Sequence, residues 1–214
     1  SGFTEGTIGV GIDAFGHFAV KLDAQEGESG TGNLPMDRNG KAEDSFGTAG
    51  AAVKLRLSKT QLRYGNMQPT APVFAVGGTR LLPQTATGFE LKSSEIEGLD
   101  LEAGRYTSTN SNVTTNQDHD IYALYANVTA RKATFAGAVY QLTPNWTASL
   151  YGAQFEDVWN QYYANTNYVL ALSDDQSLTF DANLYRTLDE GQSKAGSINN
   201  TTASLSATYA FLAA

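Results

Sequence analysis

Long segments of this 214-residue chain alternate strictly between apolar and polar side chains, which restricts them to extended structure. From Ser177 to Tyr185 the apolar side chains fall on one side and the polar ones on the other, and Thr202 to Phe211 repeats the pattern. Because successive side chains of a strand point to opposite faces, each segment predicts a strand with one apolar and one polar side. Repeated long strands of this kind, with aromatic residues near their ends, are typical of a transmembrane β-barrel, whose outside contacts lipid and whose inside contacts water.

The alternation predicts an all-β, antiparallel fold with roughly ten or eleven strands in this chain. We expect them at residues 7–22, 53–58, 61–64, 89–92, 99–103, 122–128, 135–140, 146–152, 163–172, 177–185 and 202–211. Very short turns are expected at 59–60, 98, 144 and 174–175, and long polar loops at the other strand ends, including 24–45, 107–119 and 189–200. Short turns at one end and long loops at the other match outer-membrane barrels.

Composition argues against several function classes. The formal net charge of -8 is unfavourable for a nucleic-acid partner bound through its phosphates. The absence of cysteine excludes disulfides, thiolate metal sites and cysteine nucleophiles. The two histidines, His17 and His119, are too few for an imidazole metal triad, and there is no GxSxG elbow. We therefore expect no catalysis, no cofactor and no metal site.

One segment departs from the strand pattern. Residues 68–83, QPTAPVFAVGGTRLLP, contain three of the five prolines and a Gly77-Gly78 pair, yet they are apolar enough to require burial. Ordinary surface loops are more polar than this. The segment is therefore expected to pack against other parts of the protein.

Several runs resemble the OprD family of pseudomonad outer-membrane porins. They are SGFTEGTIGVGIDAFG, TGNLP, the stretch from KLRLSKTQLRYGNMQPTAPVFAVGG to LDLEAGR, LYGAQFEDVWNQYYANTNY and NLYRTLDEGQSKAGSINNTT. The resemblance covers essentially the whole chain, and MQPTAP with RLLPQT is its most specific part. It implies a monomeric 18-stranded barrel that passes small carboxylate-bearing solutes. It also implies that residues 1–214 are one interior segment of the barrel, without the family's first strands and the C-terminal strands that close the wall.

The resemblance further implies a set of site residues. The loop at about 68–83 would fold into the barrel and form the constriction, with Arg80 matching the arginine that contacts substrate there. Tyr125 matches a lumen-lining tyrosine opposite this loop, and Phe74 is a further candidate within the loop. QPTAPVFAVGG is closer to the branch associated with basic amino acids than to the one associated with aromatic acids. Lipid and lipopolysaccharide of the bacterial outer membrane are the expected surroundings.

The polar phase of the strands carries charge. Lys54, Arg56, Arg63 and Lys92 share the inward phase and suggest a basic track through the lumen. Fixed cations suit a carboxylate that loses water in a narrow pore, and arginine can bind it with two hydrogen bonds. The alternative is that these cations are structural and form ion pairs across the lumen with Asp13, Glu90, Asp100 or Glu102.

The apolar phase carries the aromatic residues that we expect in the girdles, which are Tyr122, Trp146, Tyr168, Tyr209 and Phe211. Arg105 falls on the same phase and is expected beyond the apolar band.

Two rival hypotheses remain at this stage. A soluble β-sandwich or small ligand-binding or adhesion barrel would bury the apolar faces of 178–184 and 203–211 under a second sheet. An outer-membrane barrel enzyme, such as a lipase or protease, would hydrolyse its substrate through a serine or histidine.

Overall fold

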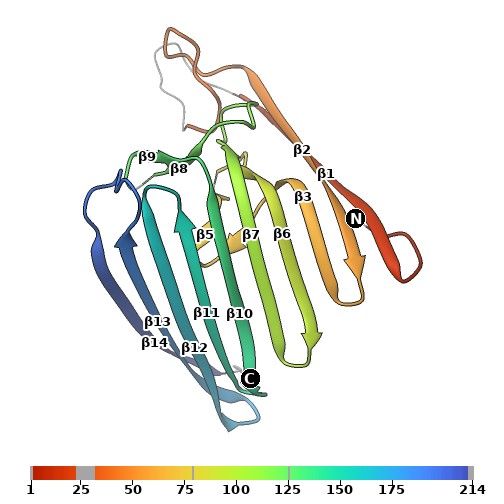
Figure 1. Ribbon diagram of the computed structural model, residues 1–214, viewed down its shortest axis with the longest axis vertical. Helices are drawn as coiled ribbons and strands as arrows, with labels where there is room; N and C mark the ends of the chain where they lie inside the picture. Colours follow the sequence, from red (N-terminus) through yellow and green to blue (C-terminus); the bar gives the residue numbers. More distant parts are fainter. Residues whose placement is uncertain (1, 23–31, 79, 125, 212–214) are drawn as a thin grey trace.

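The computed structural model describes residues 2–22, 32–78, 80–124 and 126–211, which form one large antiparallel sheet (Figure 1). The sheet has ten strands in the order β1-β2-β3-β6-β7-β10-β11-β12-β13-β14. Their bounds are β1 Ile8–Val20, β2 Ser45–Leu57, β3 Thr60–Met67, β6 Thr85–Ile96, β7 Leu99–Asn110, β10 Ala133–Thr143, β11 Trp146–Phe155, β12 Trp159–Ser173, β13 Gln176–Asp189 and β14 Asn199–Phe211. Among the described residues, no helix has the length and apolar character needed to cross a bilayer.

Two small hairpins lie outside the large sheet. The first pairs β4 (Thr70–Ala71) with β5 (Phe74–Ala75), and the second pairs β8 (Ile121–Ala123) with β9 (Val128–Ala130). In Figure 1 the β4–β5 hairpin lies behind β7 and β10, on one face of the curved sheet, while β1 and β14 form its two edges. The hairpins therefore belong to the connections and not to the wall.

Four details of the sequence prediction are wrong. The expected strand at 122–128 is instead the β8–β9 hairpin, so Tyr122 does not belong to a wall strand. The polar loop expected from 107 begins only after Asn110, because residues 108–110 pair with β6 and the side chains of Ser108 and Asn110 are buried. The β11–β12 connection, at the long-loop end, is only residues 156–158. The turn expected at 59–60 lies at 58–59.

The faces of the sheet carry the polarity expected of a membrane barrel. Apolar side chains stand exposed along the convex wall, including Ile12 at 66 %, Leu150 at 67 % and Leu205 at 76 %. Charged side chains are buried on the opposite face, where Lys54 is 4 % and Glu90 1 % exposed. A soluble sandwich would show the reverse. Only a hydrocarbon environment makes such an outer face stable.

Aromatic side chains gather at the short-turn end of the outer face. Trp146 and Tyr168 are paired in register, and their rings meet edge to face at 6.5 Å. Tyr209 and Phe211 stack at 5.7 Å on β14. Amphipathic rings at this level are typical of the girdle at the border of the apolar band. Arg105 lies on the outer face between Phe89 and Thr134, as its phase predicted.

Candidate functional site: an inward-packed hairpin beside a charged wall

The β4–β5 hairpin packs on the inner face of the sheet through one aromatic anchor. Phe74 is 5 % exposed, and its ring stacks on Tyr106 with 4.8 Å between centroids. Phe155 at 5.7 Å and Phe135 at 6.1 Å complete the platform beneath it. Buried aromatic clusters of this kind combine a large apolar area with favourable ring geometry. Phe74 therefore fixes the hairpin against β7, β10 and β11.

The tip and the root of this connection are held separately. At the tip, the Tyr185 hydroxyl of β13 donates to the carbonyl oxygen of Pro72 at 3.3 Å. At the root, the Gln84 backbone N–H donates to the Gly77 carbonyl at 2.8 Å, while the Gln84 side chain accepts from the Gly77 N–H at 3.1 Å. Because the root joins β3 to β6 and the tip reaches β13, the connection crosses the inner face over most of the intervening strands.

Beside the aromatic platform lies a buried network of charges. Glu90 accepts hydrogen bonds from Arg63 Nη2 and, at 3.0 Å, from the Tyr106 hydroxyl. Lys92 Nζ is 3.7 Å from Glu90 Oε1 and 3.0 Å from Glu102 Oε1. A carboxylate so deeply buried requires these partners. Tyr106 therefore links the two parts of the site, since its ring supports Phe74 and its hydroxyl binds Glu90.

The remaining two wall cations lie near the N-terminal segment. Lys54 Nζ is 2.6 Å from Asp13 Oδ1, and it lies 4.6 Å from the centre of the Phe3 ring. The Arg56 guanidinium lies over the same ring at 4.6 Å. Within the described ranges Arg56 makes no ion pair.

These contacts distinguish between the two interpretations of the inward cations. Lys54, Arg63 and Lys92 are in ion pairs, as the structural alternative expects, with Asp13, Glu90 and Glu102 as the partners. The fourth carboxylate considered, Asp100, accepts instead from the Ser94 hydroxyl. Of the four cations, Arg56 has the charge that is least compensated.

Arg80 lies apart from the wall cations, where three connections meet. Its side chain is exposed, and a Cβ added at Gly32 would lie 3.0 Å from Arg80 Nη1. The next residue, Leu81, approaches the Asn33 side chain, and Asn112 donates to the Gly32 carbonyl at 3.2 Å. Arg80 therefore sits between the loops at the long-loop end. Tyr125, the other constriction candidate, lies outside the described residues.

A second inner-face cluster is neutral and polar apart from one carboxylate. Asp181 on β13 accepts hydrogen bonds from the side-chain amides of Asn165 and Asn167 on β12, at 3.0 and 3.1 Å, and from Asn183. The Tyr163 hydroxyl donates to Asn183 at 2.6 Å. The inner face thus changes from ion pairs on β1–β7 to an amide ladder on β12 and β13.

Sequence reasoning missed the platform under Phe74. One signal was available, because Phe135, Tyr151 and Phe155 lie on the water-facing phase of their strands. Aromatic rings on that phase need another segment to shield them from water. Residues 68–83 were an apolar segment that had not been assigned to a strand. No comparable signal identifies Tyr106 as the partner of Glu90, since that contact depends on strand register.

The described residues hold no group of three or more His, Cys, Asp or Glu that could bind a metal ion.

The ten-stranded antiparallel sheet has an apolar outer face and a polar inner face, and one connection packs on the inner face. This arrangement defines the wall of a β-barrel channel. A family model described as "outer membrane porin, OprD family" matches residues 1–214. The chain belongs to this family, and its location is the bacterial outer membrane.

Individual relatives agree with this assignment. Porin D of Pseudomonas aeruginosa is 57 % identical over 209 residues, covering 98 % of this chain and 47 % of the relative. The crystal structure of OccAB2 from Acinetobacter baumannii has a TM-score of 0.93 at 32 % identity, covering 99 % of this chain and 55 % of that one. The structure of Pseudomonas aeruginosa OpdK with vanillate has a TM-score of 0.88 at 36 % identity, covering 97 % and 55 %. This chain spans about half the length of the curated relatives it matches.

Proposed function

We propose that this chain forms part of the wall of a monomeric barrel that allows small carboxylate-bearing solutes, such as amino acids or related organic acids, to diffuse across the outer membrane. The observation that carries the proposal is the inward packing of the 68–83 connection on the polar face of a membrane barrel wall. A connection that crosses the lumen side reduces the cross-section open to solute. Membership of a porin family supports the same role.

Within this channel we assign Arg80 to recognition of the solute carboxylate. Its exposed guanidinium belongs to the connection that narrows the lumen and lies at the long-loop end, where solutes enter from outside. Arg56 would act next, because it carries the least compensated positive charge along the wall. Lys54, Arg63 and Lys92 would mainly shape the local potential, since carboxylates already neutralise much of their charge.

The relatives are consistent with solutes of this class but do not define the solute of this chain. The OpdK structure contains vanillate, which is a carboxylate. The preference for basic amino acids, suggested by the sequence of 68–83, would require an acidic group near the path of the ammonium. Asp181 supplies one carboxylate on the inner face, although its oxygens are occupied by amide donors.

The test uses the full-length protein in planar bilayers and in liposomes. Arg80→Ala should raise single-channel conductance, because a long side chain leaves the constriction. It should also lower the preference for a carboxylate solute over its neutral amide by about tenfold, the value of one charge-assisted hydrogen bond. Arg38→Ala is the matched control, since it removes an exposed arginine from a neighbouring long loop. Unchanged current and unchanged preference in Arg80→Ala would reject the assigned role.

The outer-membrane enzyme is disfavoured by family membership, because the relatives are named as porins. Hydrolysis by the purified protein that disappears on changing a single serine or histidine would support that rival instead.

A further inference from the structure

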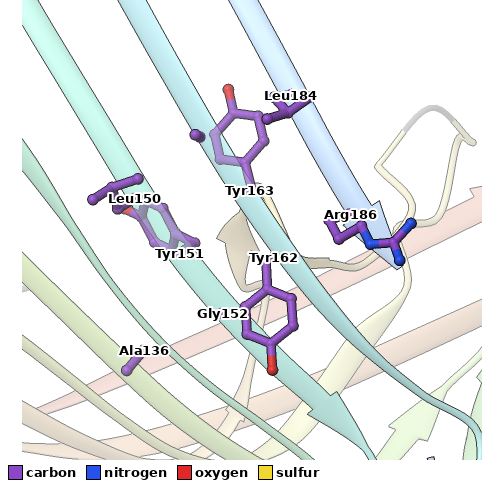
Figure 2. Close-up of a pocket in the computed structure, with 9 residues that line it drawn as sticks. Ala136, Leu150, Tyr151, Gly152, Tyr162, Tyr163, Leu184 and Arg186 are labelled. Carbon is purple, nitrogen blue, oxygen red and sulfur yellow. The ribbon is translucent and has the colours of Figure 1, made fainter. Parts of the chain in front are cut away.

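The outer face of the wall carries a shallow hollow of about 400 Å³ over β10 to β13. Its lowest part is formed by the small residues Ala136, Gly152 and Ala164. Around them stand three larger side chains that are exposed to the surroundings, with Leu150 at 67 %, Tyr162 at 51 % and Leu184 at 45 %. The lining is almost entirely apolar apart from one guanidinium, that of Arg186 (Figure 2).

The strand register shows that this hollow faces lipid and not the lumen. Ala136, Gly152, Tyr162 and Arg186 are successive cross-strand partners and therefore share one face. The residues adjacent to them in sequence face the other way, since Tyr163 and Tyr185 bond to Asn183 and to the Pro72 carbonyl of the inward hairpin. The hollow is thus separate from the solute path.

Arg186 is an unusual residue for this face. Its Nη1 donates to the Thr201 hydroxyl at 3.0 Å, and among the described residues no carboxylate lies within ion-pair distance of it. A charged side chain on the lipid face of a barrel destabilises it unless a polar partner is present. Thr201 is a polar partner but carries no charge, so an anionic group of the membrane can neutralise Arg186.

The depth of Arg186 in the bilayer identifies the membrane layer that it contacts. Leu178, beside the Tyr209 girdle ring, precedes it by eight residues on the same strand. At about 3.3 Å per residue and a tilt of about 40°, this separation is about 20 Å along the membrane normal, against an apolar band of about 25 Å. Arg186 therefore lies at the border of the band nearest the long loops, which face the exterior in bacterial barrels.

We propose that this hollow binds a lipopolysaccharide molecule of the outer leaflet, with one lipid A acyl chain over Ala136, Gly152 and Ala164 and a lipid A phosphate on Arg186. The guanidinium matches a phosphate with two parallel hydrogen bonds. The Tyr162 ring lies beside Gly152, where a Cβ would be 3.5 Å from Tyr162 Cδ1, and it forms one side of the chain's path (Figure 2).

The neighbouring rim explains why Arg186 is the anchor. Lys132 and Arg131, at the long-loop end of β10, both pair with Glu156, at 2.8 and 3.3 Å. The hydrogen bond from Lys132 holds the pKa of Glu156 below its usual range, so this carboxylate stays ionised and keeps the two cations occupied. Arg186 has no such competitor among the described residues. Of these three cations around the hollow, Arg186 is therefore the one whose charge no described carboxylate neutralises.

The experiment is native mass spectrometry of the purified full-length protein in detergent, titrated with Kdo2-lipid A or, separately, with phosphatidylglycerol. Arg186→Gln should weaken lipid A binding about tenfold, as expected for loss of a charge-assisted hydrogen bond. Gly152→Leu should weaken it similarly by filling the hollow, and the Cβ added there would make only ordinary contacts, with Tyr162. Arg105→Gln, which removes an arginine from the same face outside the hollow, is the matched control and should change binding by less than twofold.

Three results would overturn the proposal: lipid A binding that is unaltered in Arg186→Gln and Gly152→Leu, an equal loss in Arg105→Gln, or phosphatidylglycerol that binds as tightly as lipid A. The last result would indicate a site for anionic phospholipid. If Arg186→Gln does not fold, Gly152→Leu alone decides the outcome. Single-channel conductance should stay at the wild-type value in all three variants, which separates this proposal from the proposed channel function.

Discussion

Removal of the Phe74 ring should release the hairpin from the channel wall. Phe74→Ala deletes the side chain that lies on Tyr106, Phe135 and Phe155. Truncation of a buried phenylalanine costs about 3–5 kcal/mol. The other contact at the tip, from Tyr185 to the Pro72 carbonyl, contributes only about 0.5–1.5 kcal/mol. The aromatic contact therefore dominates the docking of the tip.

The size of this loss predicts a measurable change in current. About 3 kcal/mol lowers the equilibrium constant for docking by about two orders of magnitude. A hairpin that spends part of its time undocked should raise the mean single-channel conductance and add current noise. It should also expose residues 72–76 to added protease. Phe74→Leu keeps most of the apolar volume and should show a smaller change.

The matched control is Phe89→Ala, which deletes the same atoms from the outer face, where Phe89 is 49 % exposed. Lipid fills that space, so conductance and protease resistance should stay at wild-type values. Equal conductance, noise and protease resistance in Phe74→Ala and wild type would refute the reasoning, since the ring would then not hold the hairpin in place.

Two further predictions concern the inner wall. In Gly137→Ala the new Cβ would overlap the Tyr151 ring, which must then move away from Glu102. Stability in urea unfolding should therefore fall by about 1–3 kcal/mol. Gly152→Ala, with a nearest contact of 3.5 Å, should be close to neutral, and equal stabilities of the two variants would contradict this account. Arg63→Gln should destabilise the barrel by about 3 kcal/mol, because it leaves the more distant Lys92 as the only cation beside Glu90 among the described residues. Arg56→Gln should preserve stability and shift the reversal potential toward cations. The opposite assignment of effects would show that Arg63 and not Arg56 supplies the usable charge.

Much of the wall could be read from the sequence because alternation is a local property. Phe180 and Leu205 were assigned to the outer face, and both are exposed there, at 37 % and 76 %. Lys54 and Arg63 were assigned to the inner face, where they lie. The prediction failed at 122–128, where a short apolar run forms a hairpin in a connection, because periodicity alone does not say whether a segment pairs with the main sheet.

The candidate site was predictable only in outline. The apolar composition of 68–83 indicated burial, and Phe74 is buried. The water-facing phase of Phe135 indicated that its ring needs a covering segment, but its meeting with Tyr106 under Phe74 was not predictable, because that contact depends on how β7 and β10 pair. The assignments of Arg80 and Tyr125 came from family resemblance and remain predictions.

The sequence by itself determined which side of each strand meets hydrocarbon and which meets water, since a period of two residues needs no knowledge of the neighbours. Only the tertiary structure decided that Glu90 binds Arg63 and Tyr106, that Phe74 rests on a shared aromatic platform, and that Arg186 borders a hollow facing lipid. The physical reason is register. Contacts between strands depend on how far each strand slides past the next, and that displacement is fixed by turns, bulges and packing that alternation does not encode.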